Sequence, residues 1–329
     1  MLVPMATLDS NLLEQFRRDG YLVIRGLLDV ERDFQPVERE YDEVLDRLID
    51  QWRSEGRLSS TLDGLPFCER LVRAVTEAEA AYDLHFDISL PQANISEETP
   101  MHHGPAVFDL LTNPRLLDVV EQFVGPEIYS NPVQHTRIKL PEDLLPEASR
   151  TGLTGEVAWH QDLGVVTTEA DDTETLTVWF PMTRATVENG CLAVVPGSHH
   201  AELALHCHSR NPSTLNQVSI PKSSVTEEPL LLPMEPGDVL FMHRKTQHTG
   251  TPNRSNEVRW SFDLRYQPIG QPTGRPWFPG FVARSRANPE TELGDASRWR
   301  ESWCEARAQL SRGDNLSFNR WKQGDPRCA

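Results

Sequence analysis

The chain has 329 residues, of which 38% are hydrophobic and 25% charged, a composition typical of a folded protein with a substantial core. Its 49 acidic residues outnumber 32 basic ones, and the formal net charge of −17 disfavours binding to nucleic acid or to an anionic membrane. No apolar run approaches the roughly 18 residues of a membrane span, and the first residues lack the pattern of a signal peptide. We therefore expect a cytoplasmic protein without nucleic-acid or membrane partners, and its oligomeric state stays open.

Helical patterns dominate the first part of the chain. A helix is expected over residues 10–20, followed by a short strand over 21–25. Apolar residues then recur at helical spacing over 37–52, and another helix is expected over about 66–82. A short helix over 113–125 begins with an Asn-Pro pair and ends at a glycine.

Short β-rich runs separated by turns fill the middle of the chain, from about residue 127 to 268. Many short strands with this punctuation predict a barrel or jelly roll. One more helix is expected over about 296–310. The prediction is a single domain: a helical N-terminal part (1–126), a β core (about 127–268) and a C-terminal extension (269–329).

The five cysteines are odd in number, scattered, and without a Cys-x-x-Cys spacing. This pattern favours five free thiols over a disulfide framework or a structural zinc site. The cysteines are Cys68, Cys191, Cys207, Cys304 and Cys328.

A histidine and an aspartate stand two residues apart in the stretch "WHQD", residues 159–162. On a strand, positions i and i+2 point to the same face, so His160 and Asp162 can offer a nitrogen and an oxygen to one ion. Two histidines and one carboxylate form the facial site of non-haem Fe(II) oxygenases. The alternative is an ordinary polar pair that is hydrogen-bonded inside a sheet.

The best candidate for the third ligand is His248, which follows a strand that ends near His243. Arg259 comes eleven residues after His248, on the next expected strand. A guanidinium there can bind a carboxylate through two parallel hydrogen bonds. The pair His160 and Asp162 is weak evidence alone, but the four residues together indicate a metal site beside an anion-binding arginine.

These motifs resemble the phytanoyl-CoA dioxygenase family of Fe(II)/2-oxoglutarate-dependent oxygenases. "WHQD", "ENGCLAVVPGSHH" and "HTGTPNRSNEVR" occur in the order of the family pattern, and the resemblance covers roughly residues 8–268. It implies a double-stranded β-helix (a jelly roll, cupin-like), with Fe(II) held by His160, Asp162 and His248. It also implies that Arg259 binds the distal carboxylate of 2-oxoglutarate.

The resemblance further implies a reaction. An enzyme of this family uses O₂, with ascorbate as a candidate reductant, and converts 2-oxoglutarate to succinate and CO₂ while it oxidises a substrate. Related halogenases lack the carboxylate ligand, so Asp162 favours hydroxylation of an unactivated C–H bond over halogenation. Desaturation, epoxidation and ring formation stay open.

Three further residues are candidates for the cosubstrate site. His135 corresponds to a family position near the iron or 2-oxoglutarate, and the alternative is a structural histidine. Trp179 corresponds to an aromatic position near the metal, and the alternative is a core tryptophan. Gly250 stands where the family often has a hydroxyl that contacts 2-oxoglutarate, so that this hydrogen bond is missing or comes from a neighbour such as Thr249.

Several other polar residues have no assigned role. His102 and His103 lie in a polar segment that we expect to form part of a lid over the pocket, and Lys139 is left open. The remaining histidine cluster is expected to have loop or supporting roles. It consists of His199, His200, His206 and His208.

Two classes of function therefore compete. The leading hypothesis is an Fe(II)/2-oxoglutarate-dependent dioxygenase that acts on a small organic molecule. The alternative is a non-catalytic, cupin-like protein that binds or senses a small molecule in the same pocket. A secondary metabolite or an amino-acid-like molecule suits the acidic chain better than a large CoA thioester.

Overall fold

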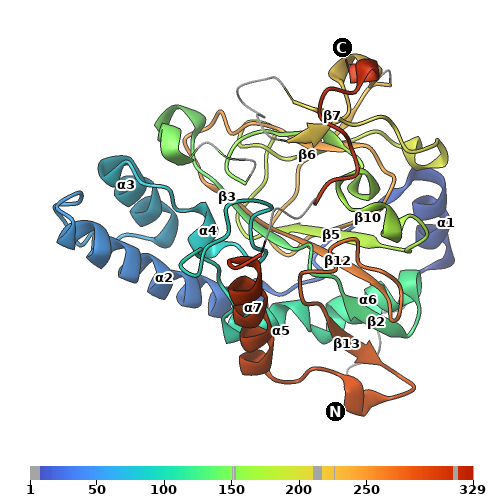
Figure 1. Cartoon of the computed structure of the whole chain (residues 1–329), viewed down its shortest axis with the longest axis horizontal. Helices are drawn as coiled ribbons and strands as arrows, with labels where there is room; N and C mark the ends of the chain where they lie inside the picture. Colours follow the sequence, from blue (N-terminus) through green and yellow to red (C-terminus); the bar gives the residue numbers. More distant parts are fainter. Residues whose placement is uncertain are drawn as a thin grey trace.

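The computed structural model describes residues 8–149, 151, 153–209, 217–225, 227–313 and 318–328. Two large antiparallel sheets, a small two-stranded sheet of β7 and β8, and a set of helices make up the described part of the molecule (Figure 1). The helices are α1 (Ser10–Asp19), α2 (Gln35–Ser54), α3 (Phe67–Ala78), α4 (Asp83–Phe86), α5 (Pro105–Leu111), α6 (Pro114–Val124) and α7 (Ala296–Leu310). The strands are β1 (Tyr21–Ile24), β2 (Glu127–Ser130), β3 (His135–Lys139), β4 (Val157–His160), β5 (Leu176–Pro181), β6 (Leu192–Val194), β7 (Cys207–His208), β8 (Val218–Ser219), β9 (Leu230–Leu232), β10 (Val239–His243), β11 (His248–Gly250), β12 (Arg259–Pro268) and β13 (Phe281–Ser285).

The helices form where local signals predict them. Asp9 caps α1 by accepting a hydrogen bond from the amide of Asn11, and Gly20 ends the helix at φ 76°. Asn113 caps α6, which starts with a proline and ends at Gly125. Helix α2 buries one apolar stripe, made of Val37, Tyr41, Val44, Leu45, Leu48, Ile49 and Trp52.

The major sheet has seven strands in the order β1-β10-β5-β12-β2-β13, with β3 also paired to β12. Strand β12 shows how its two faces differ, because successive side chains of a strand point to opposite sides. Four of its side chains join the hydrophobic core shared with the helices: Trp260, Phe262, Leu264 and Tyr266. The alternate positions are polar and lie on the other face: Arg259, Ser261, Asp263, Arg265 and Gln267.

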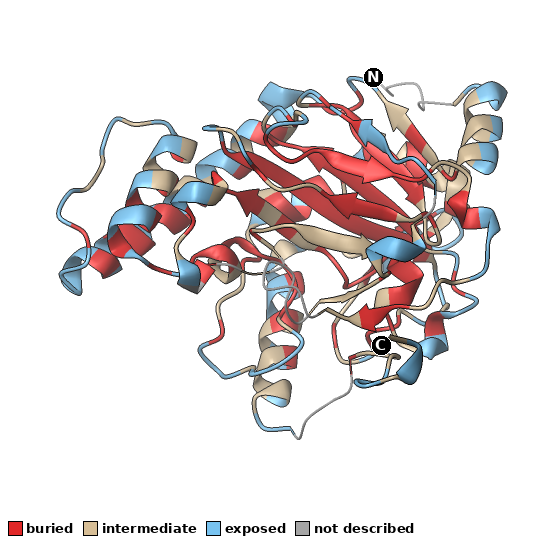
Figure 2. Ribbon diagram, turned by 90° about the horizontal axis from the view of Figure 1, so that it is seen from above, coloured by how far each residue is buried: buried red, intermediate tan, exposed pale blue. Residues whose placement is uncertain are grey.

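The minor sheet has four strands in the order β4-β11-β6-β9. It packs on the inner face of the major sheet through a cluster that includes Trp179 and Leu240 from one sheet and Leu192 and Val194 from the other. Buried residues accordingly concentrate in the strands and on the inner sides of the helices (Figure 2). Within the described residues neither sheet closes into a barrel. The predicted β-rich jelly roll with an N-terminal helical cover is confirmed.

His102 and His103, which we expected in part of a lid, are buried in the helical layer. His102 Nε2 lies 2.7 Å from Glu40 Oε1, and its ring packs against Tyr41. The His103 ring stacks on Trp303 of α7, at 5.0 Å between ring centroids. Their polar sequence context suggested a loop over the pocket, but α2 packs on His102, and α7, which returns from the far end of the chain, packs on His103.

The prediction of five free thiols is wrong for two of the cysteines. Cys207 and Cys328 form a disulfide, whereas Cys68, Cys191 and Cys304 are free. The bonded residues are 121 positions apart, so that no local spacing signals the pair. The disulfide lies at the end of residues 318–328, which we call the C-terminal strap (Figure 1).

The strap packs against the turn that follows Asp162. Trp321 Nε1 donates to the carbonyl of Gly164 at 2.6 Å, and Arg320 donates to the carbonyls of Val166 and Thr167 at 2.8 and 2.9 Å. The Trp321 ring also stacks on His206. The strap thus supports residues close to the metal-site candidates.

Removing the disulfide is expected to destabilise the fold. The double variant C207S/C328S should lose about 2–4 kcal/mol of unfolding free energy, because its unfolded chain is no longer closed into a loop. Chemical denaturation of the oxidised protein measures the difference, with C304S as a control that keeps the disulfide. Equal denaturation midpoints for the double variant and C304S would contradict the prediction.

Histidine burial predicts a loss of stability in acid. Burial, and then the neighbouring His199, lower the pKa of His243 from 6.5 to about 4. Between these values the unfolded chain binds more protons than the folded one, so the stability present above about pH 6.5 falls as the pH drops towards about 4. Asparagine can keep the hydrogen bond that His243 Nδ1 accepts from the amide of Lys245. We expect H243N to lose less unfolding free energy than the wild type between pH 7 and pH 5, by up to about 1.4 kcal/mol per pH unit. Identical pH profiles in denaturation experiments would disprove this role of His243.

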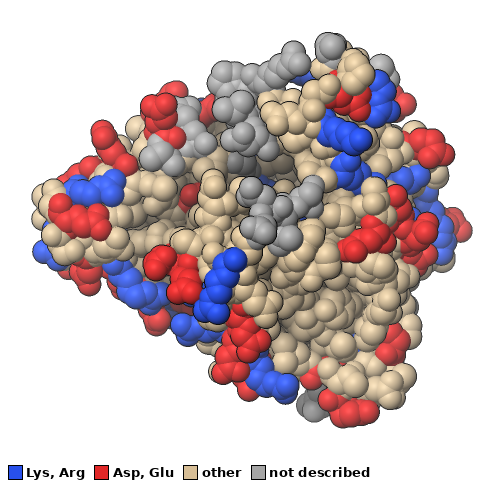
Figure 3. All heavy atoms as spheres, viewed as in Figure 1, with Lys and Arg blue, Asp and Glu red and all other residues tan. Residues whose placement is uncertain are grey.

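The described helices include none that is long and apolar enough to cross a membrane. On the face drawn in Figure 3, acidic and basic side chains are interspersed around the periphery.

Candidate metal and cosubstrate site

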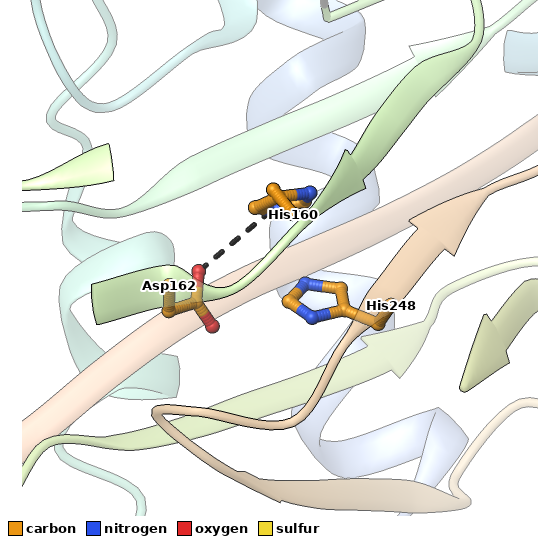
Figure 4. A group of neighbouring side chains, drawn as sticks. All are labelled: His160, Asp162 and His248. Carbon is orange, nitrogen blue, oxygen red and sulfur yellow. Dashed lines mark ion pairs between the residues drawn. The ribbon is translucent and has the colours of Figure 1, made fainter. Parts of the chain in front are cut away.

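The three residues of the predicted metal site come together at the inner face of the minor sheet (Figure 4). His160 ends β4 and His248 begins β11, and the two are direct cross-strand partners. Asp162 lies just beyond the strand, at the start of a short 3₁₀ turn. One ligand atom from each of the three residues lies within 4.8 Å of the others. This group fits a single metal ion.

Both imidazoles are oriented by backbone carbonyls. His160 Nδ1 donates to the carbonyl of Ala158 at 2.8 Å, and His248 Nδ1 donates to that of Thr246 at 3.0 Å. This leaves the Nε2 lone pairs available for a metal. Burial, and then the adjacent His248, lower the pKa of His160 to about 3, so that its ring is neutral at pH 7.

The Asp162 carboxylate is held through both oxygens. Thr177 Oγ1 donates to Oδ2, and Arg265 Nη2 donates to Oδ1. Burial alone would raise the pKa of Asp162, but Arg265 and then the two histidines lower it below its usual range. The site therefore offers an ionised carboxylate beside the neutral imidazole of His160.

Gln161 and His206 fix the backbone between the candidate ligands His160 and Asp162. The Gln161 amide donates to His206 Nε2 at 3.0 Å. The Gln161 side chain is fully buried, accepts from the amide of Ala204 and donates to the carbonyl of Lys245. Burial lowers the pKa of His206 to about 4, which keeps its Nε2 an acceptor.

A cavity lies beside the triad, between the two sheets. Its lining combines the candidate metal ligands with polar residues of the major sheet. The lining residues are Arg137, Val157, His160, Trp179, Leu192, Met242, His248, Gly250, Arg259 and Asp263.

Arg259 is the buried cation of this cavity. Its side chain is 0% exposed, and its Nη1 donates to Ser261 Oγ. Its Nε and Nη2 have no hydrogen-bond partner among the described residues. Burial, and then Arg137, lower the pKa of Arg259 to about 9. A buried guanidinium with unpaired donors fits the carboxylate of a bound acid, because leaving the charge unpaired is costly.

The other predicted site residues are divided between the cavity and its surroundings. Trp179 lines the cavity, and its ring centroid lies 5.7 Å from the guanidinium carbon of Arg259. His135 is outside the lining, and its Nδ1 lies 2.9 Å from Asp87 Oδ2. Thr249 is outside the lining too, and its hydroxyl donates to the carbonyl of Val157.

Lys139 contacts the backbone at Gly250, the position where the family often has a hydroxyl. The fully buried Lys139 Nζ donates to the carbonyls of Gly250 and Thr251 at 3.3 and 2.9 Å. Lys139 therefore supports the bend after β11. The hydroxyl nearest to Arg259 is that of Ser261, which the sequence reasoning did not select.

The residues that sequence reasoning missed share one pattern. Ser261, Asp263 and Arg265 alternate with apolar residues along β12, and Thr177 faces Arg265 across the β5–β12 pair. A polar residue at every second position of an otherwise apolar strand was the available signal. It shows a polar inner face, but not which partner each residue contacts.

A jelly roll that brings together two histidines and one carboxylate has the arrangement of the non-haem iron oxygenases. The model of the phytanoyl-CoA dioxygenase (PhyH) family matches residues 16–261. The chain therefore belongs to this family, whose members are Fe(II)/2-oxoglutarate-dependent oxygenases. Iron, 2-oxoglutarate and O₂ are accordingly the cofactor and cosubstrates of its class.

Curated relatives include enzymes with different substrates. Human peroxisomal phytanoyl-CoA dioxygenase is 26% identical over 268 residues, which are 79% of this chain and 70% of the human enzyme. The 1-deoxypentalenic acid 11-beta-hydroxylase of Streptomyces arenae is 28% identical over 281 residues, 82% of this chain and 86% of that enzyme.

Solved structures share the fold. The non-heme monooxygenase ThoJ has a TM-score of 0.51 at 17% identity and covers 91% of this chain and 98% of its own. EvdO2 from Micromonospora carbonacea var. aurantiaca, complexed with 2-oxoglutarate, has a TM-score of 0.50 at 20% identity and covers 84% of this chain and 98% of its own.

Proposed function

We propose that this chain hydroxylates an unactivated C–H bond of a small organic substrate, with Fe(II) held by His160, Asp162 and His248. The observation that carries the proposal is the convergence of these three residues next to a buried arginine with unpaired donors. Arg259 binds the distal carboxylate of 2-oxoglutarate in this proposal. A binding module without catalysis would need neither a three-residue metal site nor a separate carboxylate clamp.

Iron, 2-oxoglutarate and O₂ would supply the oxidising power when bound. O₂ would be consumed as 2-oxoglutarate is converted to succinate and CO₂ and the substrate is oxidised. The protein orients and shields these reactants. Ser261 and Trp179 flank the Arg259 guanidinium and fix its direction. The cavity lies between the two sheets, where charge pairing is stronger than in bulk water.

The proposed substrate is a secondary metabolite or a small amino-acid-like molecule. Support comes from the acidic chain, whose net charge of −17 disfavours a large anionic CoA thioester. The Streptomyces relative is named as a hydroxylase of 1-deoxypentalenic acid, which is a small molecule without CoA.

Anaerobic addition of Fe(II) and 2-oxoglutarate tests the activity. We expect a weak visible charge-transfer band and, on admission of O₂, slow release of succinate without substrate. A metabolite panel should then contain a compound that accelerates succinate release, and its product should gain one oxygen atom. Absence of both the band and succinate would refute the proposal.

The second candidate is a non-catalytic, cupin-like small-molecule sensor. Tight binding of a panel compound without O₂ consumption would favour it. Product mass separates the remaining oxidations, since desaturation and ring formation remove two hydrogens whereas hydroxylation adds oxygen. Epoxidation also adds oxygen and is distinguished by the loss of an alkene.

A further inference from the structure

A second buried arginine, Arg265, faces the same interior as Arg259 but has different partners. Its side chain is only 4% exposed and lies opposite Thr177 in the β5–β12 register. It donates to Asp162 Oδ1 and, at 3.0 Å, to the carbonyl of Val133. Its Nη1 also lies 3.4 Å from Asp263 Oδ1.

Stability alone is a weak reason for this arrangement. A buried ion pair contributes little net stability, because the loss of hydration offsets most of the attraction. The chain also satisfies other buried guanidinium groups without carboxylates, as at Arg275, which donates to the carbonyls of Gly274 and Phe318. The contact of Arg265 with Asp162 therefore calls for an explanation at the metal site.

Thr177 and Arg265 each donate a hydrogen bond to a different oxygen of the Asp162 carboxylate. Thr177 engages Oδ2, while Oδ1, the atom 3.9 Å from His160 Nε2, accepts from Arg265. A carboxylate oxygen has two lone-pair positions, so Oδ1 can accept from Arg265 and still bind a metal. Held at both oxygens, the carboxylate cannot rotate freely, and it presents Oδ1 rather than Oδ2 towards His160 Nε2.

We propose that Arg265, together with Thr177, is the positioning residue that holds Asp162 as a one-oxygen iron ligand. This inference rests on the proposed iron site. A carboxylate that bound through both oxygens would occupy a position that the cosubstrate or O₂ needs. Asp162 lies on a short turn beyond the end of β4, so the pairing of the strand does not hold it. Without its two donors the carboxylate could rotate, and its bond to the metal would weaken.

Neighbouring charges keep this arrangement compatible with burial. Asp263 lies between Arg265 and Arg137, with Arg137 Nη2 at 3.4 Å from Asp263 Oδ2. A chain of ion pairs with alternating charge thus runs from the turn after β4 to the cavity wall, in the order Asp162, Arg265, Asp263 and Arg137. Arg265 remains charged in this buried position because the carboxylates of Asp162 and Asp263 both lie beside it.

Metal affinity tests the role without any substrate. Anaerobic titration with Fe(II), and with Co(II) as a spectroscopic probe, should show about 10–100-fold weaker binding for R265Q than for the wild type. R265K keeps the charge and a single donor nitrogen in place of the guanidinium fork, and it should recover part of this loss. T177V removes only one hydroxyl and should also weaken binding and shift the charge-transfer band of the Fe(II)–2-oxoglutarate complex.

R284Q is the matched control for loss of a buried ion pair. Arg284 on β13 is 10% exposed and pairs with Asp118 and Glu121, which lie on α6. R284Q should lower thermal stability but keep metal affinity within about twofold of the wild type, well below the 10–100-fold loss typical of a residue that orients a metal ligand.

The outcomes separate the two proposals. A wild type without metal binding or a charge-transfer band refutes the proposed function itself. A wild type with both, but with R265Q and T177V binding metal as tightly as the wild type or more tightly, overturns the positioning role alone. If R265Q does not fold, T177V and R265K decide the question, because both keep the buried site largely filled.

Discussion

Replacing Arg259 with methionine is expected to weaken 2-oxoglutarate binding by about 2–5 kcal/mol, the usual effect of removing one partner of a buried, hydrogen-bonded charge pair. This corresponds to roughly 30-fold to several thousand-fold in Kd. The Nε and Nη2 of Arg259 have no partner among the described residues, so both are available for a carboxylate. Calorimetric titration of the Mn(II)-loaded protein with 2-oxoglutarate measures the change.

The same substitution should have the opposite effect on the stability of the protein without ligands. A buried guanidinium with two unpaired donors costs folding free energy, and burial already lowers its pKa to about 9. We expect R259M to raise the unfolding free energy of the ligand-free protein by about 1–3 kcal/mol. R284Q, which breaks satisfied ion pairs, should lower it. A destabilised R259M that still binds 2-oxoglutarate normally would show that Arg259 is structural.

Asp162→Asn is expected to abolish metal-dependent activity while the fold persists. The amide keeps the shape of the side chain and an oxygen that can accept from Arg265 or Thr177, but it loses the negative charge that binds the metal. Loss of several kcal/mol of metal binding should reduce Fe(II)-dependent succinate release by ~10³-fold or more. Anaerobic Fe(II) binding and succinate release measure the two effects separately.

Asp162→Ala is the informative comparison. It removes the partner of a buried arginine, which typically costs about 3–5 kcal/mol of stability. D162A should therefore lose both metal binding and thermal stability, whereas D162N loses mainly the first. If D162N kept wild-type metal affinity and succinate release, Asp162 would have no role as a ligand.

Much of the fold follows from local patterns. Capping residues and apolar spacing predict helices α1, α2, α6 and α7 to within about two residues, a typical uncertainty of helix ends. His248 was expected as the third ligand because of its residue type and its place after an expected strand, and it is the cross-strand partner of His160. Such features depend only on residues that are close in the sequence, or on a motif that can be recognised in the sequence itself.

Partners that are distant in sequence could not be predicted in this way. The sequence did not indicate that the Thr249 hydroxyl donates to the carbonyl of Val157 on the neighbouring strand. The Cys207–Cys328 disulfide joins residues 121 positions apart. In each case the contact depends on how the sheets and the C-terminal strap pack, which no local pattern encodes.

The sequence by itself determined the class of chemistry, because the residue types and order of His160, Asp162, His248 and Arg259 carry it. Only the tertiary structure decided how Asp162 is held. Its donors, Thr177 on β5 and Arg265 on β12, belong to the major sheet, whereas Asp162 follows a strand of the minor sheet. The physical reason is that a hydrogen bond between two sheets depends on their register and packing distance, and both arise from the whole core.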